Sequence, residues 1–159
     1  MQYNSIPDYF SRLQNRTLII FFASALFFLV LFYLLMTGIL TPVMSMDEGA
    51  FIVYVVVAAA FIDGFISFFL VRIILTKSIN KPSLGERMDA YAKLSVFRSL
   101  IIASGSFMLM LALYLSNWSW LLMIYSVYLL FYLLSWPSRS RLSAELKLKP
   151  SEQEVIMAS

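Results

Sequence analysis

Residues 17–40 read TLIIFFASALFFLVLFYLLMTGIL and carry no charge. A bilayer hydrocarbon core of ~30 Å requires roughly 20 apolar residues in a helix. Three further stretches are comparable: residues 50–75, 94–115 and 118–134. Their apolar residues run continuously instead of alternating, which disfavours the strands of a membrane barrel. We therefore expect an all-α polytopic membrane protein, a single domain over residues 1–159 whose four transmembrane helices form two in–out–in hairpins.

Composition points the same way and removes several kinds of chemistry. The 159 residues are 61% hydrophobic and only 13% charged, whereas soluble domains are about 25% charged. The absence of Cys and His removes disulfides, thiolate ligands and the usual general base. The sequence also lacks a nucleotide-binding glycine loop and any recognisable catalytic spacing of Ser with Lys or an acid. We expect no enzymatic activity, no cofactor, no metal and no nucleic-acid partner.

The distribution of charge predicts the orientation. Two of the 12 basic residues precede the first span, six surround the middle connection and four lie in the tail. The connections at 41–49 and 116–117 carry only Asp47 and Glu48 as charges. Basic residues concentrate on the cytoplasmic side of membrane proteins. Both termini, the loop 76–93 and the tail 137–159 are therefore expected in the cytoplasm.

Side chains at the ends of the spans are expected to anchor them at headgroup depth, with apolar parts inward and polar tips towards water. The expected anchors are Arg16, Arg72, Arg98, Trp118, Trp120 and Trp136. Two interpretations stay open for the first 16 residues: a short interfacial helix starting after Pro7, or an extension of the first span. In the tail, Ser151 with Glu154 is a candidate capping box after Pro150.

Asp63 is the sharpest candidate for a functional residue. It lies at the midpoint of the second span, where an ionised carboxylate costs at least ~2.5–3.5 kcal/mol. We expect it to be protonated and to face other helices or a cavity. The candidate hydrogen-bonding partners are Ser24, Ser67, Ser104 and Ser106. Small residues that would permit close helix packing beside it are Ala59, Ala60, Gly64 and Gly105.

Two interpretations of Asp63 are weighed. In the first it is a proton or cation site; in the second it is a neutral carboxylic acid that joins helices by hydrogen bonds. We favour the second, because proton paths usually need several relay groups and the spans hold no second acid.

Part of the first half recurs 82 residues later. Tyr9 and Arg16 correspond to Tyr91 and Arg98, and Ser24 corresponds to Ser106. An internal duplication into two parallel hairpins is one explanation of this correspondence.

Residues 86–154 resemble a known group. Tyr91-x6-Arg98 leads into LIIASGSFMLMLALYLSNWSW, and the chain closes with WPSRSRLSAELKLKPSEQE. This order resembles a loosely defined group of uncharacterised bacterial four-helix inner-membrane proteins, which implies a bacterial inner membrane. Members often carry a Glu shortly after the Arg, where this chain reads Ala103-Ser104-Gly105. The resemblance brings no activity with it.

The stretch AAAFIDGFISFF looks like the ion site of the proteolipid c subunits of rotary ATPases. The first span lacks their glycine ladder, however, and the second hairpin has no carboxylate. We therefore expect a non-enzymatic accessory or scaffold subunit in the lipid bilayer, packed on itself as a homo-oligomer or on a larger membrane complex. The alternative is a small proton, ion or solute transporter, or a channel component, that uses Asp63.

Overall fold

The computed structural model describes residues 5–44, 46–116 and 118–158, and their side chains except those of 46–49, which include Asp47 and Glu48. These ranges hold six helices and no strand. The helices are α1 (Ile6–Met36), α2 (Met46–Ile79), α3 (Leu84–Ser116), α4 (Leu121–Leu134), α5 (Arg139–Glu145) and α6 (Pro150–Met157). The prediction of an all-α chain is confirmed.

Three helices are long and apolar enough to cross a membrane: α1, the part of α2 from residue 50 onward, and α3. The helix α4 has only 14 residues, about 21 Å at the α-helical rise, which is short of the ~30 Å core. It is followed by α5 after a bend of 81°. The predicted fourth span at 118–134 is therefore helical only from Leu121 and does not reach the length of a crossing by itself.

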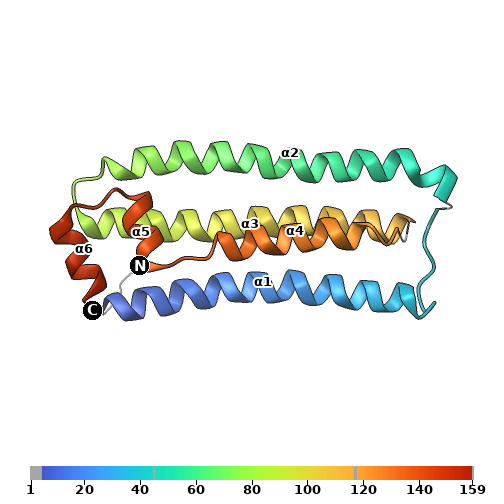
Figure 1. Ribbon diagram of the computed structural model, residues 1–159, viewed down its shortest axis with the longest axis horizontal. Coiled ribbons are helices and arrows are strands. Elements are labelled where there is room, and N and C mark those ends of the chain that lie inside the picture. The colour runs from blue at the N-terminus through green and yellow to red at the C-terminus, as the bar shows by residue number, and fades with distance from the viewer. Residues whose placement is uncertain (1–4, 45, 117, 159) are drawn as a thin grey trace.

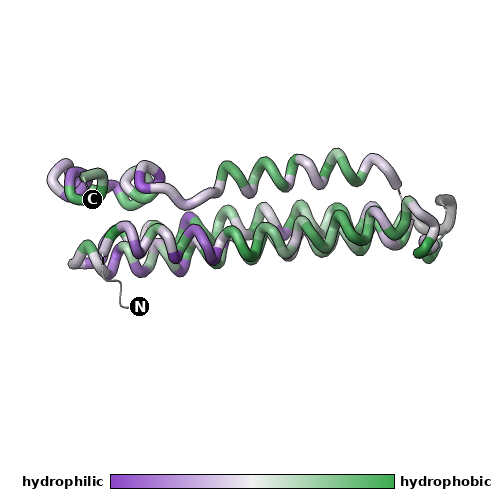
Figure 2. The backbone as a smooth tube through the Cα atoms, turned by 90° about the horizontal axis from the view of Figure 1, so that it is seen from below, coloured by the Kyte–Doolittle hydropathy of each residue, from purple (hydrophilic) through white to green (hydrophobic). Residues whose placement is uncertain are grey.

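The helices form two layers. In the first, α3 lies between α1 and α2 (Figure 1). The second consists of α4, α5 and α6, which lie together on one face of the first layer (Figure 2). The extensive contacts are those of α3 with α2, with α1 and with α4. The second predicted hairpin, α3 with α4, thus packs on itself, whereas α1 and α2 of the first predicted hairpin each pack mainly on α3.

The connection from α1 to α2 explains this arrangement. The backbone N–H groups of Val43 and Met44 donate to the carbonyls of Tyr114 and Leu115 at 3.4 and 3.1 Å. Those carbonyls belong to the last turn of α3, where a helix has no partners of its own. The connection therefore crosses the end of α3 and delivers α2 to the side opposite α1.

The N-terminal segment extends the first span. Ser5 is the N-cap of α1, and its hydroxyl accepts from the N–H of Asp8 at 3.3 Å. Pro7 lies in the first turn, where its missing N–H is not needed. The helix then runs without interruption to Met36. Of the two interpretations left open, the continuous helix is the observed one.

The middle connection is shorter than the sequence suggested. We expected a loop over 76–93, but α2 continues to Ile79 and α3 begins at Leu84. Ser83 caps α3 by accepting from the N–H of Glu86 at 3.2 Å. The first turns of α3 stay helical because they bury apolar surface: Tyr91 and Ala92 are 0% and 4% exposed.

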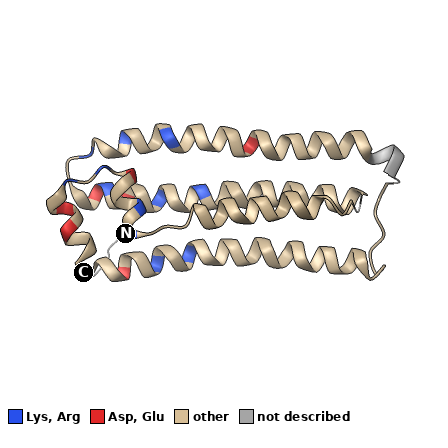
Figure 3. Cartoon of the chain, in the orientation of Figure 1, with Lys and Arg blue, Asp and Glu red and all other residues tan. Residues whose placement is uncertain are grey.

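A second apolar core lies at the end of the bundle that holds both termini. Figure 3 shows that the Lys and Arg residues gather in this half, and we call it the charged end. The buried apolar residues at this end form a cluster that we call the terminal core: Tyr9, Phe10, Leu13, Tyr91, Ala92, Leu142, Leu146, Leu148 and Ile156. The tail helices α5 and α6 therefore pack against the first turns of α1 and α3.

The cap of α6 differs from the predicted one. The helix starts at Pro150, and the Glu152 carboxylate accepts from the backbone N–H of Lys149 at 3.0 Å. The predicted pair of Ser151 and Glu154 lies two residues too late, because Pro150 itself occupies the first helical position.

The structure places the repeated residues in related environments. Tyr9 and Tyr91 both lie in the terminal core, and Ser24 and Ser106 are both 2% exposed. The following helices differ, since α2 has 34 residues and α4 has 14. The duplication stays a prediction.

Candidate functional site

Asp63 and Ser104 meet between α2 and α3. The Ser104 hydroxyl lies 2.6 Å from Oδ2 of Asp63. Both side chains are half-buried. The contact joins the two helices with the most extensive shared surface in the described chain. Asp63 thus has a partner on the neighbouring helix.

The Ser104 hydroxyl has two acceptors within hydrogen-bonding distance, one on each helix. The same hydroxyl lies 2.8 Å from the carbonyl of Ile101. A hydroxyl has one hydrogen, so it cannot donate to both oxygens at once. The Ser104 hydroxyl can therefore donate either across to Asp63 on α2 or along its own helix to Ile101. The expected protonation of Asp63 stays a prediction.

The other candidate serines do not reach the Asp63 carboxyl group. Ser67 is buried and donates to the backbone carbonyl of Asp63, one turn earlier in α2. Ser24 donates to Phe21 at 3.0 Å, and Ser106 donates to Ile102 at 3.1 Å. These hydroxyl groups satisfy themselves on their own helices, as Ser often does in apolar surroundings.

The small residues beside Asp63 receive a side chain from α4. The Tyr128 hydroxyl donates to the carbonyl of Ala60 at 2.5 Å. Its ring lies directly on Gly105, where a Cβ atom would come within 2.5 Å of Cε1. At Gly64 a Cβ atom would lie 3.8 Å from the same hydroxyl, and Ala59 is only half-buried. The close approach thus occurs at Gly105, and α4 is the helix that uses it.

The tyrosines of α4 were not foreseen as site residues. Tyr132 donates to the carbonyl of Thr17 on α1 at 3.0 Å. Tyr125 stacks on Phe28, with ring centroids 3.5 Å apart. With Tyr128 they lie at spacings of three and four residues, which puts all three on one helix face. That spacing could have indicated these tyrosines from the sequence alone. Their contacts attach α4 to both α1 and α2.

Arg98 requires a correction. We expected it to extend to lipid headgroups, but its side chain is 12% exposed and forms a two-pronged ion pair with Glu145 of α5. The distances are 3.1 Å from Nη1 to Oε1 and 3.2 Å from Nη2 to Oε2. Arg141 Nε also binds Glu145, at 2.7 Å. The arginine is drawn inward because the folded tail brings it a carboxylate.

A second ion pair holds α6. Arg87 binds Glu152 through both terminal nitrogens of its guanidinium group. This hydrogen bonding, together with the N–H of Lys149, lowers the pKa of Glu152 below its ordinary value of 4.5. Both pairs connect the first half of α3 to the tail. In the sequence, Arg87 and Arg98 together with the tail acids Glu145 and Glu152 were the features that could have suggested these pairs.

The lowered pKa predicts an acid-labile contact. A carboxylate with a lowered pKa in the folded state stabilises that state fully above its ordinary pKa, and the stabilisation is lost as the pH falls through the lowered value. We expect wild type to have a higher Tm than Glu152→Gln at pH 7, with the difference shrinking progressively as the pH falls below 4.5. Thermal unfolding in detergent across this pH range measures it. A difference that persists unchanged at pH 3 would contradict the assignment.

Of the remaining predicted anchors, Trp118, Trp120 and Trp136 flank α4, whereas Arg16 and Arg72 lie within α1 and α2. Trp118 and Trp120 pack with Tyr54, whose ring centroid is 5.5 and 6.4 Å from theirs. Arg16 and Arg72 are exposed, and Trp136 is half-buried just after α4. Among the described residues, no group of three or more acids could hold a metal ion.

Comparison with known proteins adds no relative. No protein-family model matches the chain, and neither a curated protein nor a solved structure matches it. The chemistry available at the site is hydrogen bonding between helices, through Asp63 with Ser104 and Tyr128 with Ala60.

Proposed function

We propose that this protein is a non-enzymatic accessory or scaffold subunit of a bacterial inner membrane, which packs on itself or on a larger membrane complex. The observation that carries the proposal is the use of polar groups at membrane depth. Asp63, Tyr128 and Tyr132 each bond to a neighbouring helix. Such bonds stabilise helix association in lipid. These contacts support the proposal that the polar side chains of the candidate site hold the helices together.

The outer surface supports a membrane setting. In the most apolar window of α1 only 17% of residues are buried within the chain, and in that of α2 only 22%. Large side chains such as Phe51 and Phe65 are 78% and 71% exposed. Surfaces of this kind are stable against lipid chains or against another protein.

We further propose four crossings with both termini in the cytoplasm. Residues 118–158 return from the far end of the bundle to the charged end (Figure 1). Between α4 and α5 the chain is not helical, but the Gln14 side-chain amide donates to the carbonyl of Pro137 at 3.1 Å. Irregular backbone at membrane depth is tolerated where protein groups satisfy it. The concentration of Lys and Arg at the charged end supports the orientation.

The role of Asp63 is testable by substitution. Asp63→Ala is expected to lower the free energy of unfolding in detergent by about 1 kcal/mol, because one interhelical hydrogen bond is lost. Asp63→Asn should lower it far less, since the side-chain amide oxygen can accept the hydrogen bond from Ser104 as the carboxyl oxygen does. In a double-mutant cycle, Ser104→Ala should add little to Asp63→Ala. Additive effects of these two substitutions would show that the residues do not act as a pair.

The alternative function is transport through Asp63, and the partial exposure of its side chain favours it. Two pockets at the charged end are lined by neither Asp63 nor Ser104. In proteoliposomes under an imposed pH or ion gradient, we expect wild type and Asp63→Asn to leak equally. A flux present in wild type and lost in Asp63→Asn would establish transport instead.

A further inference from the structure

Two pockets open at the charged end, one on each side of α3. The first has a volume of about 290 Å³ and lies between α1 and α3. The second, about 460 Å³, lies between α2 and α3. Lys93 and Phe97 line both, so the pockets adjoin. Their volumes approach or reach the range of roughly 300–1,000 Å³ that is usual for small-ligand sites.

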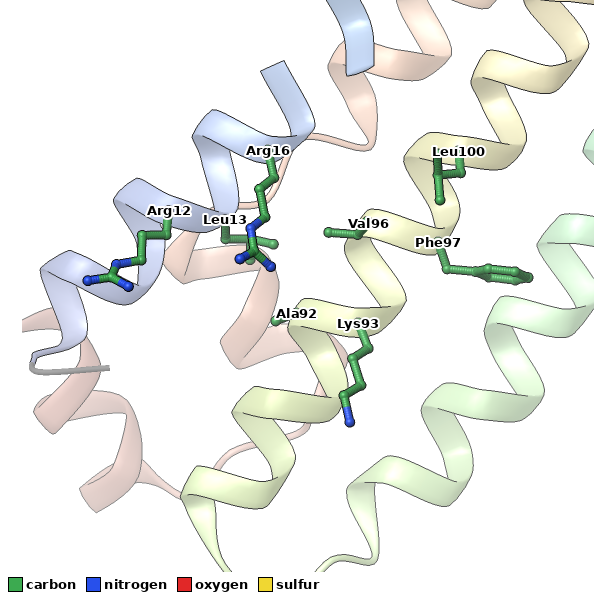
Figure 4. A pocket seen from close by; sticks show the side chains of 8 residues that line it. All are labelled: Arg12, Leu13, Arg16, Ala92, Lys93, Val96, Phe97 and Leu100. Carbon is green, nitrogen blue, oxygen red and sulfur yellow. The ribbon is translucent and has the colours of Figure 1, made fainter. Parts of the chain in front are cut away.

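The rim of the pockets is basic. Figure 4 shows Arg12 and Arg16 of α1 and Lys93 of α3 around the first pocket. Lys77 and Lys81 line the second pocket. Among the residues that the structure describes, no acid lines either pocket. Arg12 is also paired with Asp8 at 2.8 Å, and Lys77, Lys81 and Lys93 are exposed. The pockets therefore present several positive charges to one small volume.

The floor of the pockets is apolar and continues towards the middle of the bundle. Val96, Phe97 and Leu100 line the first pocket. Two and three turns beyond Leu100 on this face of α3, Phe107 and Leu111 are 52% and 49% exposed. The half-buried Ser104 lies between Leu100 and Phe107. Lys93 and Leu100 lie roughly opposite Arg98 by helical spacing, so this face points away from the tail helices. A basic rim thus leads into an uncovered apolar strip.

We propose that these adjoining pockets bind an anionic phospholipid of the inner leaflet, with its phosphate group at Lys93 and an acyl chain along Leu100 and Phe107. Charge complementarity argues for this occupant, because basic pockets between helices at the cytoplasmic side suit anionic headgroups. The apolar strip argues for a lipid in preference to a free anion. The inference rests on the membrane location proposed above.

The test uses the full-length protein in neutral detergent and native mass spectrometry with phosphatidylglycerol. We expect discrete adducts of one lipid mass and about fivefold weaker binding in Lys93→Gln, equivalent to about 1 kcal/mol. The matched control is Lys147→Gln, which removes the same charge from an exposed site outside the pockets at the same end. It should bind as wild type does. Phosphatidylcholine should bind much more weakly.

Several results would overturn the site. Equal weakening by Lys93→Gln and Lys147→Gln would indicate general attraction to positive charge. Displacement of the lipid by millimolar inorganic phosphate would indicate a free anion as the occupant. A doubled protein mass without lipid adducts would assign the pockets to a second copy. If wild-type protein that requires detergent for extraction showed no lipid adducts, the lipid site would be refuted and the proposed membrane function would still stand.

Discussion

Gly105→Ala is expected to destabilise the protein by about 1–3 kcal/mol, because the added methyl group has no space. Its Cβ atom would lie 2.5 Å from Cε1 of Tyr128, well inside van der Waals contact. The ring cannot swing aside freely, since Tyr128 is 8% exposed and its hydroxyl is bound to Ala60. We expect α4 to be displaced from α3, and reversible unfolding in detergent measures the loss.

The matched control is Gly64→Ala. Both substitutions gain the same helix propensity, but at Gly64 the new Cβ atom meets the Tyr128 hydroxyl at an ordinary 3.8 Å. Gly64→Ala should therefore be neutral or slightly stabilising. Adding Tyr128→Leu to Gly105→Ala should recover part of the loss. Equal stability of the two alanine variants would contradict the packing of α4 against Gly105.

Glu145→Gln is expected to release the tail from the bundle and to lower the free energy of unfolding by about 2–3 kcal/mol. The substitution leaves Arg98 and Arg141 facing each other without a carboxylate, and the Arg98 side chain is only 12% exposed. Removing one member of a largely buried ion pair costs most of the desolvation of the other. Protease cleavage within residues 137–158 should become faster, and mass spectrometry of the fragments measures it.

Glu154→Gln supplies the control for this prediction. Glu154 is exposed and lies in α6, so its substitution makes the same charge change in the same tail. We expect cleavage and stability close to wild type. If Glu154→Gln released the tail as readily as Glu145→Gln, net charge would explain the effect and the Arg98 pair would not.

Much of the helical architecture was predictable because apolar length dominates it. The uncharged stretch at 17–40 lies largely within α1, and the placement of Asp63 in α2 and Ser104 in α3 followed from helical depth. The contact between these side chains was one of four that the sequence allowed. Choosing among them required the rotation of α2 about its axis, which a nearly uniformly apolar helix does not reveal.

The charged end was less predictable. Arg98 was expected among lipid headgroups because its partner, Glu145, lies 47 residues later in a tail with little apolar length. The helix α4 was expected to be longer, since the apolar side chains of Trp118 and Trp120 did not reveal that its start lies at Leu121. In both cases tertiary contacts decide what local sequence leaves open. Tyr128 and Gly105 illustrate the same point, because their fit depends on two helices at once.

The proposed accessory role is tested most directly by the mass of the particle that contains this protein in its own membrane. Chemical crosslinking in intact membranes, followed by extraction in mild detergent and native mass spectrometry, gives that mass. We predict a discrete species larger than the single 18.3 kDa chain, either a multiple of it or a complex with another membrane protein. Recovery of the monomer alone, with bound lipid and no protein partner, would contradict the account.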